Sequence, residues 1–422
     1  MKKVLVVAYL YPPIFNSGTR RSLEFVNHLP DCGWEPTVLT VENPDPGECD
    51  TSLLAEVRLG TRIARAPLWG AIAAPAIARR LAWLVNPQRL AGAIEWRVRR
   101  FWNVPDGCAS WVGTAVALGK QLHTEHRFDA IYATGWPWSD FLVAARLSHA
   151  TGIPFVVDYR DLWKPAEVEW DKTTWLQRMI NPIFEQWVLK RAAGVIATTS
   201  SFLRLLPQEN LPRHQFTITN GYREEDFDAQ AAPAPAAGTV RIVYTGVWRP
   251  GYGPVDLYKA VSLLRLQGSI CLARLKIVMA GFPPGRAREY GIEDYVEELG
   301  RIPHAEAIAL MTGADALYLP VSKGVYEVAS IPGKLFEYLG SRRPVIVSSQ
   351  AGSEVAQLIG KIGGAVRLEP DDSVGLANAI EQLCLSGPNA IFSARDDAAL
   401  QRYTRSNLTR ALARALDIVS EH

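Results

Sequence analysis

A proline-glycine turn followed by a lysine and a glutamate is the part of this sequence best suited to hold a phosphate. The stretch SIPGKLFEYLGSRRPVIVSS begins at Ser330. Its turn, which ends at Gly333, leaves the N–H groups of Lys334 and Leu335 at the start of a predicted helix, where partial positive charge favours an anion. Glu337 is predicted in the first turn. There it either caps the helix or accepts hydrogen bonds from the hydroxyls of a ribose or sugar.

A second glycine, Gly18, follows the first apolar run of the chain in the segment YLYPPIFNSGTRR. A glycine in such a loop lets the backbone approach a phosphate closely, and the N-terminus of the next helix can bind it. The alternative is an ordinary turn between a strand and a helix. Because the segment is not the GxGxxG loop of dinucleotide enzymes, a dinucleotide-dependent oxidoreductase loses its usual support.

Charged and aromatic residues follow two more predicted strands. The segment VVDYRDLWKP contains Asp158, Arg160 and Asp161. Two carboxylates that flank an arginine either fix a polar acceptor or form an internal ion-pair network. The segment TGWPWSD contains Trp136 and Trp138, which are candidates to stack on a sugar or an apolar acceptor. Trp138 is equally suited to the core.

Two further segments follow the predicted linker described below. The segment YTGVWRPGYG contains Gly246 and Arg249 in a glycine-rich loop with room for an anion. Arg249, with Lys259 on the next helix, is placed to neutralise a leaving diphosphate. The segment GRIPH is a predicted turn whose backbone can hydrogen-bond the edge of a base. His304 in this turn is expected to cap a helix or lie on the surface.

Apolar runs of strand length alternate with helical patterns, which is typical of parallel β-α-β units. The expected strands cover residues 3–9, 35–41, 129–135, 154–160 and 194–200, and then 240–246, 275–281, 315–321 and 343–349. Between the two series, the alanine- and proline-rich residues 228–238 are predicted to be a linker. Open parallel sheets bind ligands beyond the carboxyl ends of their strands. We therefore expect an α/β protein with two doubly wound Rossmann-like domains that face a cleft.

Length and composition agree with this architecture. The chain has 422 residues, more than one hydrophobic core usually holds. It is 48% hydrophobic and 21% charged with a net charge of +2, values typical of a globular protein and not of a nucleic-acid-binding polycation. The five cysteines include no CxxC pair, so a reducing, cytoplasmic setting is expected. No apolar stretch is long enough to span a bilayer.

Residues 57–104 differ from the rest of the chain because they hold nine arginines, one glutamate and four tryptophans. Basic helices with interleaved tryptophans suit an anionic lipid surface, where each positive charge contributes ~1 kcal/mol. The alternative is a helical insertion whose arginines are merely solvated. Nucleic acid is not an expected partner, because no binding motif accompanies the charge.

Taken in order, PPIFNSGTRR, DYRDLWKP, YTG, GRIPHAEAIALMTGADALYLP and IPGKLFEYLGSRRPVI resemble the retaining nucleotide-sugar glycosyltransferases of the two-Rossmann-domain (GT-B) class. The similarity is to the bacterial group 1, or family 4-like, branch and covers nearly the whole chain. It implies an acceptor-binding domain over 1–228 and a nucleotide-sugar-binding domain over 239–395. It also implies a C-terminal segment, 396–422, whose helix packs back on the first domain.

The resemblance implies roles for individual residues. Glu337 would hold the nucleotide ribose, and the backbone of Ile302 would lie near the base. Asp158 or Asp161 would orient the acceptor hydroxyl. The donor diphosphate would be bound by Gly18, Gly246, Arg249, Gly333, Lys334 and Leu335, with Arg249 and Lys334 stabilising the leaving group.

The sequence departs from the family pattern at two places. Ala329 stands where relatives often carry a first glutamate, and Glu327, two residues earlier, is the candidate to replace it. The histidine that many relatives carry after the strand ending in YATG is absent, because Trp136, Pro137 and Trp138 occupy that loop. An alternative function follows from these departures, namely a catalytically silent nucleotide-sugar-binding or membrane-associated partner subunit.

The resemblance further implies transfer with retention of anomeric configuration from a donor of the UDP or GDP type. The sequence has no suitably placed DxD motif, so no metal or other cofactor is expected, and basic residues with helix termini would stabilise the leaving group. Front-face attack needs little beyond holding the acceptor hydroxyl near the leaving phosphate. The expected acceptor is lipid-linked or amphipathic, in bacterial polysaccharide, glycoconjugate or natural-product biosynthesis. The expected location is the cytoplasm, including the inner face of the plasma membrane.

Overall fold

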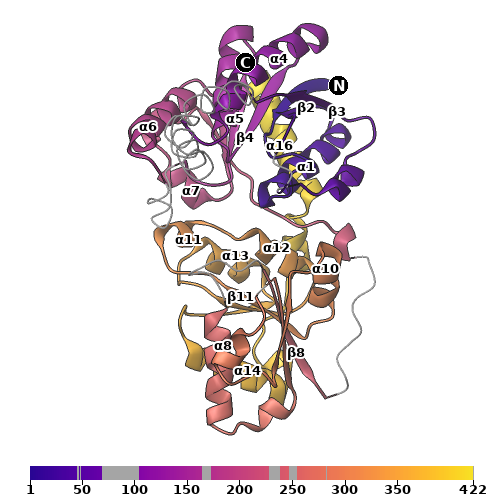
Figure 1. The fold of residues 1–422 in the computed structure, drawn as a ribbon, viewed down its shortest axis with the longest axis vertical. Coiled ribbons are helices and arrows are strands. Elements are labelled where there is room, and N and C mark those ends of the chain that lie inside the picture. Colours follow the sequence, from indigo (N-terminus) through magenta and orange to yellow (C-terminus); the bar gives the residue numbers. More distant parts are fainter. Residues whose placement is uncertain are drawn as a thin grey trace, which may run out of the picture. The chain divides into compact units, whose positions relative to one another are not determined.

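Two parallel sheets, one in each of two compact units, organise the computed structural model (Figure 1). The structure describes residues 1–44, 47, 49–68, 104–163, 173–227, 238–246, 254–281 and 283–421. The first unit comprises Met1–Thr219 and Leu408–His422, and the second comprises Asn220–Asn407. The sequence predicts domains over 1–228 and 239–395, whereas the chain enters the second unit at Asn220 and leaves it after Asn407. Both units are Rossmann-like, as the alternation of strands and helices predicts.

The first unit is built on a seven-stranded sheet among the described residues, in the order β3-β2-β1-β4-β5-β6-β7. Its strands are β1 (Lys2–Val7), β2 (Trp34–Val41), β3 (Arg62–Ala66), β4 (Ala130–Gly135), β5 (Phe155–Tyr159), β6 (Gly194–Ala197) and β7 (His214–Thr217). Its helices are α1 (Ser17–His28), α4 (Val112–His126), α5 (Ser139–Thr151), α6 (Trp175–Leu189), α7 (Ser200–Leu205) and α16 (Arg405–Ser420). Short 3-10 helices are η1 (Leu29–Cys32), η3 (Thr51–Glu56), η4 (Ala109–Trp111) and η6 (Gln208–Asn210). The winding reverses between β1 and β4, which makes their carboxyl ends the expected ligand-binding edge.

The second unit repeats this topology in a six-stranded sheet among the described residues, in the order β10-β9-β8-β11-β12-β13. Its strands are β8 (Val240–Thr245), β9 (Leu275–Ala280), β10 (Val296–Gly300), β11 (Ala316–Pro320), β12 (Val345–Ser348) and β13 (Ala365–Leu368). Its helices are α8 (Val255–Leu266), α9 (Arg286–Glu289), α10 (His304–Thr312), α11 (Val325–Ala329), α12 (Gly333–Gly340), α13 (Glu354–Ile362), α14 (Ser373–Ser386) and α15 (Asp397–Gln401). Short 3-10 helices are η7 (Glu225–Phe227), η8 (Ile270–Ala273) and η9 (Pro388–Ala390). Here the winding reverses between β8 and β11.

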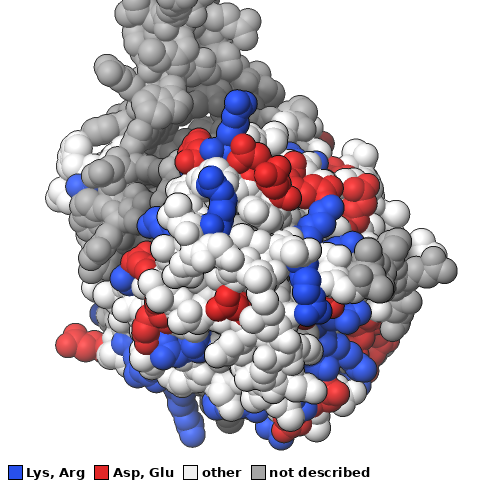
Figure 2. Space-filling model, turned by 90° about the horizontal axis from the view of Figure 1, so that it is seen from below, with Lys and Arg blue, Asp and Glu red and all other residues white. Residues whose placement is uncertain are grey.

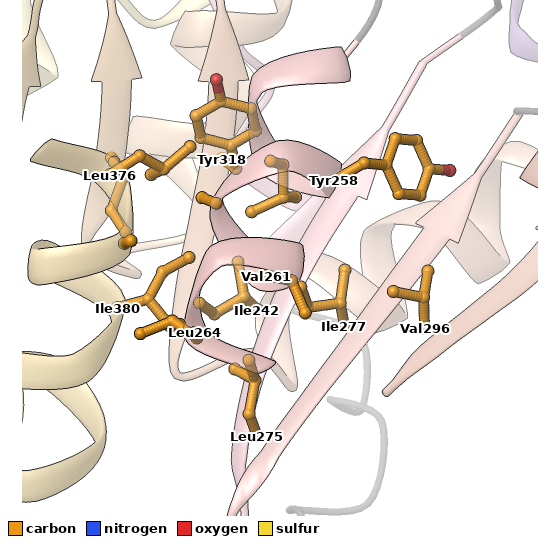
Figure 3. Close-up of a cluster of buried hydrophobic side chains, with 14 of the residues drawn as sticks. Ile242, Tyr258, Val261, Leu264, Leu275, Ile277, Val296, Tyr318, Leu376 and Ile380 are labelled. Atoms are coloured by element: carbon orange, nitrogen blue, oxygen red, sulfur yellow. The ribbon is translucent and has the colours of Figure 1, made fainter. Parts of the chain in front are cut away.

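Apolar side chains at helical and strand spacing explain how helices pack on these sheets. In the second unit, Tyr258, Val261 and Leu264 of α8 recur every three residues and are buried. They lie over Ile242 of β8 and Ile277 of β9 (Figure 3). Side chains of both charge signs are interspersed over the face that Figure 2 shows, in keeping with a net charge of only +2.

The start of the basic, tryptophan-rich segment is a strand and not a helix. Residues 57–104 are predicted to be a helical insertion, but β3 occupies Arg62–Ala66 and pairs with β2 at the edge of the first sheet. Its residues are mostly half-exposed or exposed, and Arg62 is exposed, which suits an edge strand. Residues 69–103, with all four tryptophans of the segment, lie outside the described residues.

The C-terminal helix α16 belongs to the first unit from Leu408 onward (Figure 1). Leu412 and Leu416 are fully buried in the same hydrophobic cluster as Val4 of β1. At the end of the helix, the carboxylate of Asp417 lies 2.9 Å from the ammonium group of Lys2. The last helix of the chain therefore covers part of the sheet that the first strand begins.

A buried ion pair joins the start of α1 to the end of β5. The guanidinium of Arg21 donates to both carboxylate oxygens of Asp158, with Nε–Oδ2 at 2.8 Å and Nη2–Oδ1 at 3.0 Å. It also donates to the carbonyls of Ile218 (2.7 Å) and Thr219 (2.6 Å), the last residues before the chain leaves the unit. The two charged side chains are 1% and 0% exposed. Burying a charge is costly unless it is paired and hydrogen-bonded. The fold is therefore stable only when all these partners of Arg21 are in place.

The buried pair predicts a non-additive effect on stability. Arg21→Met leaves the Asp158 carboxylate buried without its partner and is expected to lower the free energy of unfolding of the first unit by about 3–5 kcal/mol. Adding Asp158→Leu removes the unpaired charge and should recover much of that loss. Denaturant unfolding followed by fluorescence would measure both variants.

The matched control is Arg58→Met. Arg58 pairs with Asp31 at 2.8 Å, but both side chains are about half exposed, so the expected loss is at most about 1 kcal/mol. Equal effects of Arg21→Met and Arg58→Met would contradict the central role of the buried pair.

Candidate functional site

A lysine of the second unit lies against a glycine at the carboxyl end of β8. The ammonium nitrogen of Lys334 is 4.9 Å from the ring centroid of Tyr244, over its face. A Cβ atom built at Gly246 would overlap this same nitrogen. Burial raises the pKa of Tyr244 to about 12, so the ring stays neutral and attracts the cation. The missing side chain of Gly246 therefore makes room for a positive charge at the switch point of the second sheet.

Helix α12 brings Lys334 to that place. Its N-cap residue is Pro332, which makes no side-chain hydrogen bond to the N–H groups of the first turn. The hydroxyl of Tyr338 accepts a hydrogen bond from the N–H group of Thr245 at 2.9 Å, which ties α12 to the end of β8. Gly333 opens the helix, and a Cβ atom built there would lie 4.0 Å from the side-chain nitrogen of Asn220. Asn220 thus joins the candidate site, although no sequence motif singles it out.

Leu335 does not serve the site in the way the sequence predicts. Its N–H group donates to the carbonyl of Pro332 at 3.0 Å, and its side chain is fully buried. The amide that was expected to face a phosphate is therefore used inside the first turn of α12. Leu335 instead anchors the helix in the core, and the helix start offers the N–H group of Gly333.

Glu337 lies in the second turn of α12 and not in the first. It is half-buried and, because α12 begins at Gly333, it lies two residues beyond the N3 position of a capping box. The capping alternative is therefore wrong. Since residues three apart share a helix face, the carboxylate of Glu337 lies on the side of α12 that carries Lys334.

The other donor-site candidates have different surroundings. Ile302 is half-buried between β10 and α10. His304 follows the N-cap residue of α10, and its Nε2 atom lies 3.8 Å from a carboxylate oxygen of Asp226. Glu327 lies in α11, and a Cβ atom built at Gly324 would overlap its carboxylate. Arg249 lies outside the described residues, so its predicted role stays a prediction.

Gly18 of the first unit makes room for a cation in the same way as Gly246. A Cβ atom built at Gly18 would overlap the guanidinium of Arg160. Arg160 donates from Nε to the carbonyl of Gly135 at 2.9 Å and from Nη2 to the carbonyl of Trp136. These bonds hold the guanidinium at the start of α1, beside the carboxyl end of β4. The sequence identifies Arg160 only as the arginine between two carboxylates. Its position beside Gly18 makes it a functional candidate.

Asp158 does not fit its expected part in acceptor binding. It is fully buried, and besides the Arg21 guanidinium its carboxylate accepts from the hydroxyls of Tyr132 (2.5 Å) and Thr134 (3.3 Å). Burial, together with the Asp158 carboxylate, raises the pKa of Tyr132 well above its usual value, so the phenol keeps the proton that it donates. Because this carboxylate is fully buried and already accepts four hydrogen bonds inside the unit, an acceptor hydroxyl does not reach it, so the internal-network alternative holds. Asp161 is exposed at the same strand end and remains a candidate.

The aromatic residues after β4 divide between core and surface. Trp138 is buried and stacks on Trp163 with ring centroids 5.3 Å apart and an interplanar angle of 10°. Trp136 is 40% exposed. Of the two tryptophans, only Trp136 is therefore accessible to a ligand.

Comparisons with known proteins decide the family. Residues 18–221 match the model of the glycosyl transferase 4-like domain, and residues 239–386 match that of the glycosyl transferases group 1. The chain belongs to the group 1 glycosyltransferases of the GT-B fold. Together the two matches span most of this glycosyltransferase, and the boundary between them falls near the passage from the first unit to the second.

Individual relatives of this glycosyltransferase are distant. It is 24% identical over 100 residues to the probable glycosyltransferase WbjE of Pseudomonas aeruginosa, a match that spans 23% of this chain and 25% of that protein. Sucrose-phosphate synthase from Thermosynechococcus elongatus superposes with a TM-score of 0.61 at 16% identity, covering 100% of this chain and 97% of that one. HepE from Anabaena, solved in complex with UDP and glucose, gives a TM-score of 0.64 at 15% identity, covering 99% and 100%. At these identities the solved structures establish the shared fold.

Metal clusters and membrane-spanning helices are absent from the described part of the chain. No group of three or more His, Cys, Asp or Glu side chains there is arranged to hold a metal ion. None of the helices described is both long and apolar enough to cross a membrane. The five cysteines are free thiols.

The overlap between a Gly246 Cβ atom and Lys334 predicts that Gly246→Ala weakens anion binding at α12. The methyl group would displace the ammonium from the face of Tyr244. A charge-assisted contact is worth about 1.5–3 kcal/mol, so the dissociation constant for UDP or GDP should rise about tenfold or more. Isothermal calorimetry would measure the change.

Gly360→Ala is the matched control for Gly246→Ala. Gly360 lies in α13 of the same unit, and a Cβ atom built there meets nothing within 4 Å. This variant should bind nucleotide normally and be slightly more stable, because alanine favours a helix. Equal nucleotide affinity in the two variants would show that Lys334 does not need the space at Gly246.

Proposed function

We propose that this glycosyltransferase moves a sugar from a nucleoside-diphosphate sugar to a hydroxyl acceptor with retention of configuration. The observation that carries the proposal is that Lys334 and Glu337 share one face of α12. The helix start beside them has no side-chain cap. An ammonium beside open N–H groups suits a diphosphate, and a carboxylate suits the hydroxyls of a ribose. One helix thus offers partners to both halves of a nucleoside diphosphate.

In this mechanism the leaving diphosphate is stabilised by fixed positive charge. Lys334 is preorganised by Tyr244 and by the space at Gly246, so little rearrangement is needed as negative charge develops on the leaving oxygen. The N-terminus of α12 adds its partial charge. We propose that Arg249 contributes a further cation and that no metal ion or other cofactor is required. The donor is of the UDP or GDP type, with its base near the backbone of Ile302.

The acceptor is proposed to bind to the first unit. Trp136, 40% exposed, and Asp161, also exposed, follow neighbouring strands at the carboxyl edge of that sheet. An aromatic face beside a carboxylate suits a molecule with an apolar and a hydroxyl-bearing part. Arg160 and Gly18 offer an anion site at the same edge. We propose a lipid-linked or otherwise amphipathic acceptor, in bacterial polysaccharide, glycoconjugate or natural-product biosynthesis.

A cytoplasmic location goes with this proposal. All five cysteines are free, although two of them, Cys271 and Cys384, are buried in one hydrophobic cluster. Free thiols in such numbers suit a reducing compartment. Nucleoside-diphosphate sugars as donors agree with the same setting.

The second candidate function is a catalytically silent nucleotide-sugar-binding subunit. Ala329 is 3% exposed and packs into the core, so nothing at that position can replace a carboxylate. The carboxylate of Glu327, which lies on the same short helix, approaches Gly324. If catalysis needs a carboxylate from α11, Glu327 has to supply it. If Glu327 does not take part in catalysis, the protein would bind the donor without turning it over.

Glu337→Gln tests whether Glu337 binds the ribose of the nucleotide donor. The neutral amide keeps the shape of the side chain but loses the charge-assisted bonds to ribose hydroxyls, which are worth about 1.5–3 kcal/mol. A nucleoside diphosphate that raises the melting temperature of the parent protein should bind the variant about tenfold or more weakly. Glu306→Gln, an exposed site on α10, should bind as the parent does.

Turnover separates the enzyme from the silent subunit. With donor, an acceptor mixture and excess EDTA, we expect release of the nucleoside diphosphate and a product whose anomeric proton shows the configuration of the donor by NMR. Product of inverted configuration would refute retention, and loss of activity with EDTA would refute metal independence. Donor binding without any turnover, in parent and Glu327→Gln proteins alike, would favour the silent subunit.

A further inference from the structure

Helix α6 carries an exposed apolar stripe on the surface of the first unit. Trp175, Met179 and Ile183 are 58%, 63% and 63% exposed. Each step of four residues advances about 40° around a helix, so the three side chains lie within one narrow face. Large apolar side chains that gather on a surface in this way mark a site of interaction, unlike ones that are scattered singly.

The opposite face of α6 accounts for its packing in the fold. Val188, on this face, is fully buried, and α6 lies beside α5 in the first unit (Figure 1). Val188 is about half a turn away from the centre of the apolar stripe. The stripe is therefore not needed to attach the helix to its own unit.

The charge on α6 identifies the partner as an anionic one. Arg178 lies within the helix, and Lys190 and Arg191 follow its last residue; all three are exposed. The acid in this helix, Glu185, is 8% exposed, and burial raises its pKa to about 7. A helix that exposes tryptophan, methionine and isoleucine, has cations within it and after its last residue, and exposes no acid of its own has the amphipathic character of helices that lie in a membrane interface.

The place of the stripe in the fold agrees with this partner. In a parallel sheet, the segment after a strand leaves from its carboxyl end, so α6, which follows β5, begins near the edge that carries Trp136 and Asp161. Trp175 is the first residue of α6. A lipid surface bound there would hold a lipid-linked acceptor beside the acceptor edge.

We propose that α6 docks this glycosyltransferase on an anionic lipid surface through Trp175, Met179 and Ile183, with Arg178, Lys190 and Arg191 contacting the headgroups. The docking deepens the proposed function, on which its purpose rests, because it names the surface that would present an amphipathic acceptor. It places the contact on a described helix.

Vesicle co-sedimentation of the full-length protein tests the docking. The probes are phosphatidylcholine vesicles with and without phosphatidylglycerol, and the variant combines Trp175→Gln, Met179→Gln and Ile183→Gln. The parent should sediment with the anionic vesicles and much less with the neutral ones. The variant should bind the anionic vesicles at least about tenfold more weakly, since both buried apolar area and charge contribute to interfacial binding.

A matched variant shows whether the location of the apolar side chains matters. Leu266→Gln, Ile270→Gln and Leu385→Gln remove three exposed apolar side chains from the second unit, which are 76%, 76% and 48% exposed. This protein should bind vesicles as the parent does. Both variants should keep the thermal shift with nucleoside diphosphate, which shows that they are folded.

The outcomes separate the docking from the proposed function. Equal vesicle binding by parent and α6 variant, or no preference for anionic lipid, would overturn the docking while leaving donor binding intact. A parent that is a dimer by light scattering and becomes a monomer in the α6 variant, without binding vesicles, would assign the stripe to a second copy and also overturn it. Lack of any nucleotide shift or turnover alongside α6-dependent vesicle binding would instead refute the sugar-transfer function alone.

Discussion

The first unit depends on one buried guanidinium. Arg21 is taken out of water, and it stays charged at an acceptable cost only because Asp158 and two backbone carbonyls together accept from it. These partners come from β5 and from the end of the unit at Ile218 and Thr219. The requirement that all of them be present fixes where α1 starts relative to β5. Gly18, in the first turn of α1, and Arg160, just after β5, take their positions from this arrangement.

In the second unit, a helix is fixed relative to a strand end without a buried ion pair. There the hydroxyl of Tyr338 accepts from the backbone of Thr245, so a neutral bond ties α12 to the end of β8. Burial raises the pKa of Tyr338, and the phenol stays uncharged. The charged group of this site, Lys334, is left half-buried against Tyr244. Lys334 therefore keeps partial contact with solvent, whereas Arg21 is fully enclosed by the fold.

The sequence predicts the sheets well because their strands are continuous apolar runs with both faces covered, as in residues 3–9 and 275–281. It misses the four edge strands β3, β7, β10 and β13, which are only partly buried. In β3, Arg62 and Arg65 are three residues apart and give no strand periodicity, so composition alone makes the segment look like the basic stretch that follows. The burial of Asp158 was unpredictable, since its partner lies 137 positions away in the chain. Leu335 and Glu337 were misplaced for a local reason: their roles depend on which residue opens α12, and a shift of one or two residues changes which amide is open and which turn holds the carboxylate.

Gly18 in the first unit and Gly246 in the second each leave room for a cationic side chain near the end of a strand. Neither glycine has a positive φ, so backbone conformation does not explain why a side chain is absent. Lack of space explains it: a Cβ atom at Gly18 would overlap the guanidinium of Arg160, and one at Gly246 would overlap the ammonium of Lys334. Each glycine follows the first strand beside a switch point, and each cation comes from later in the chain. A sheet of this topology can therefore place a charge at its ligand-binding edge with one glycine and one long basic side chain, and the lack of a GxGxxG loop does not by itself argue against phosphate binding.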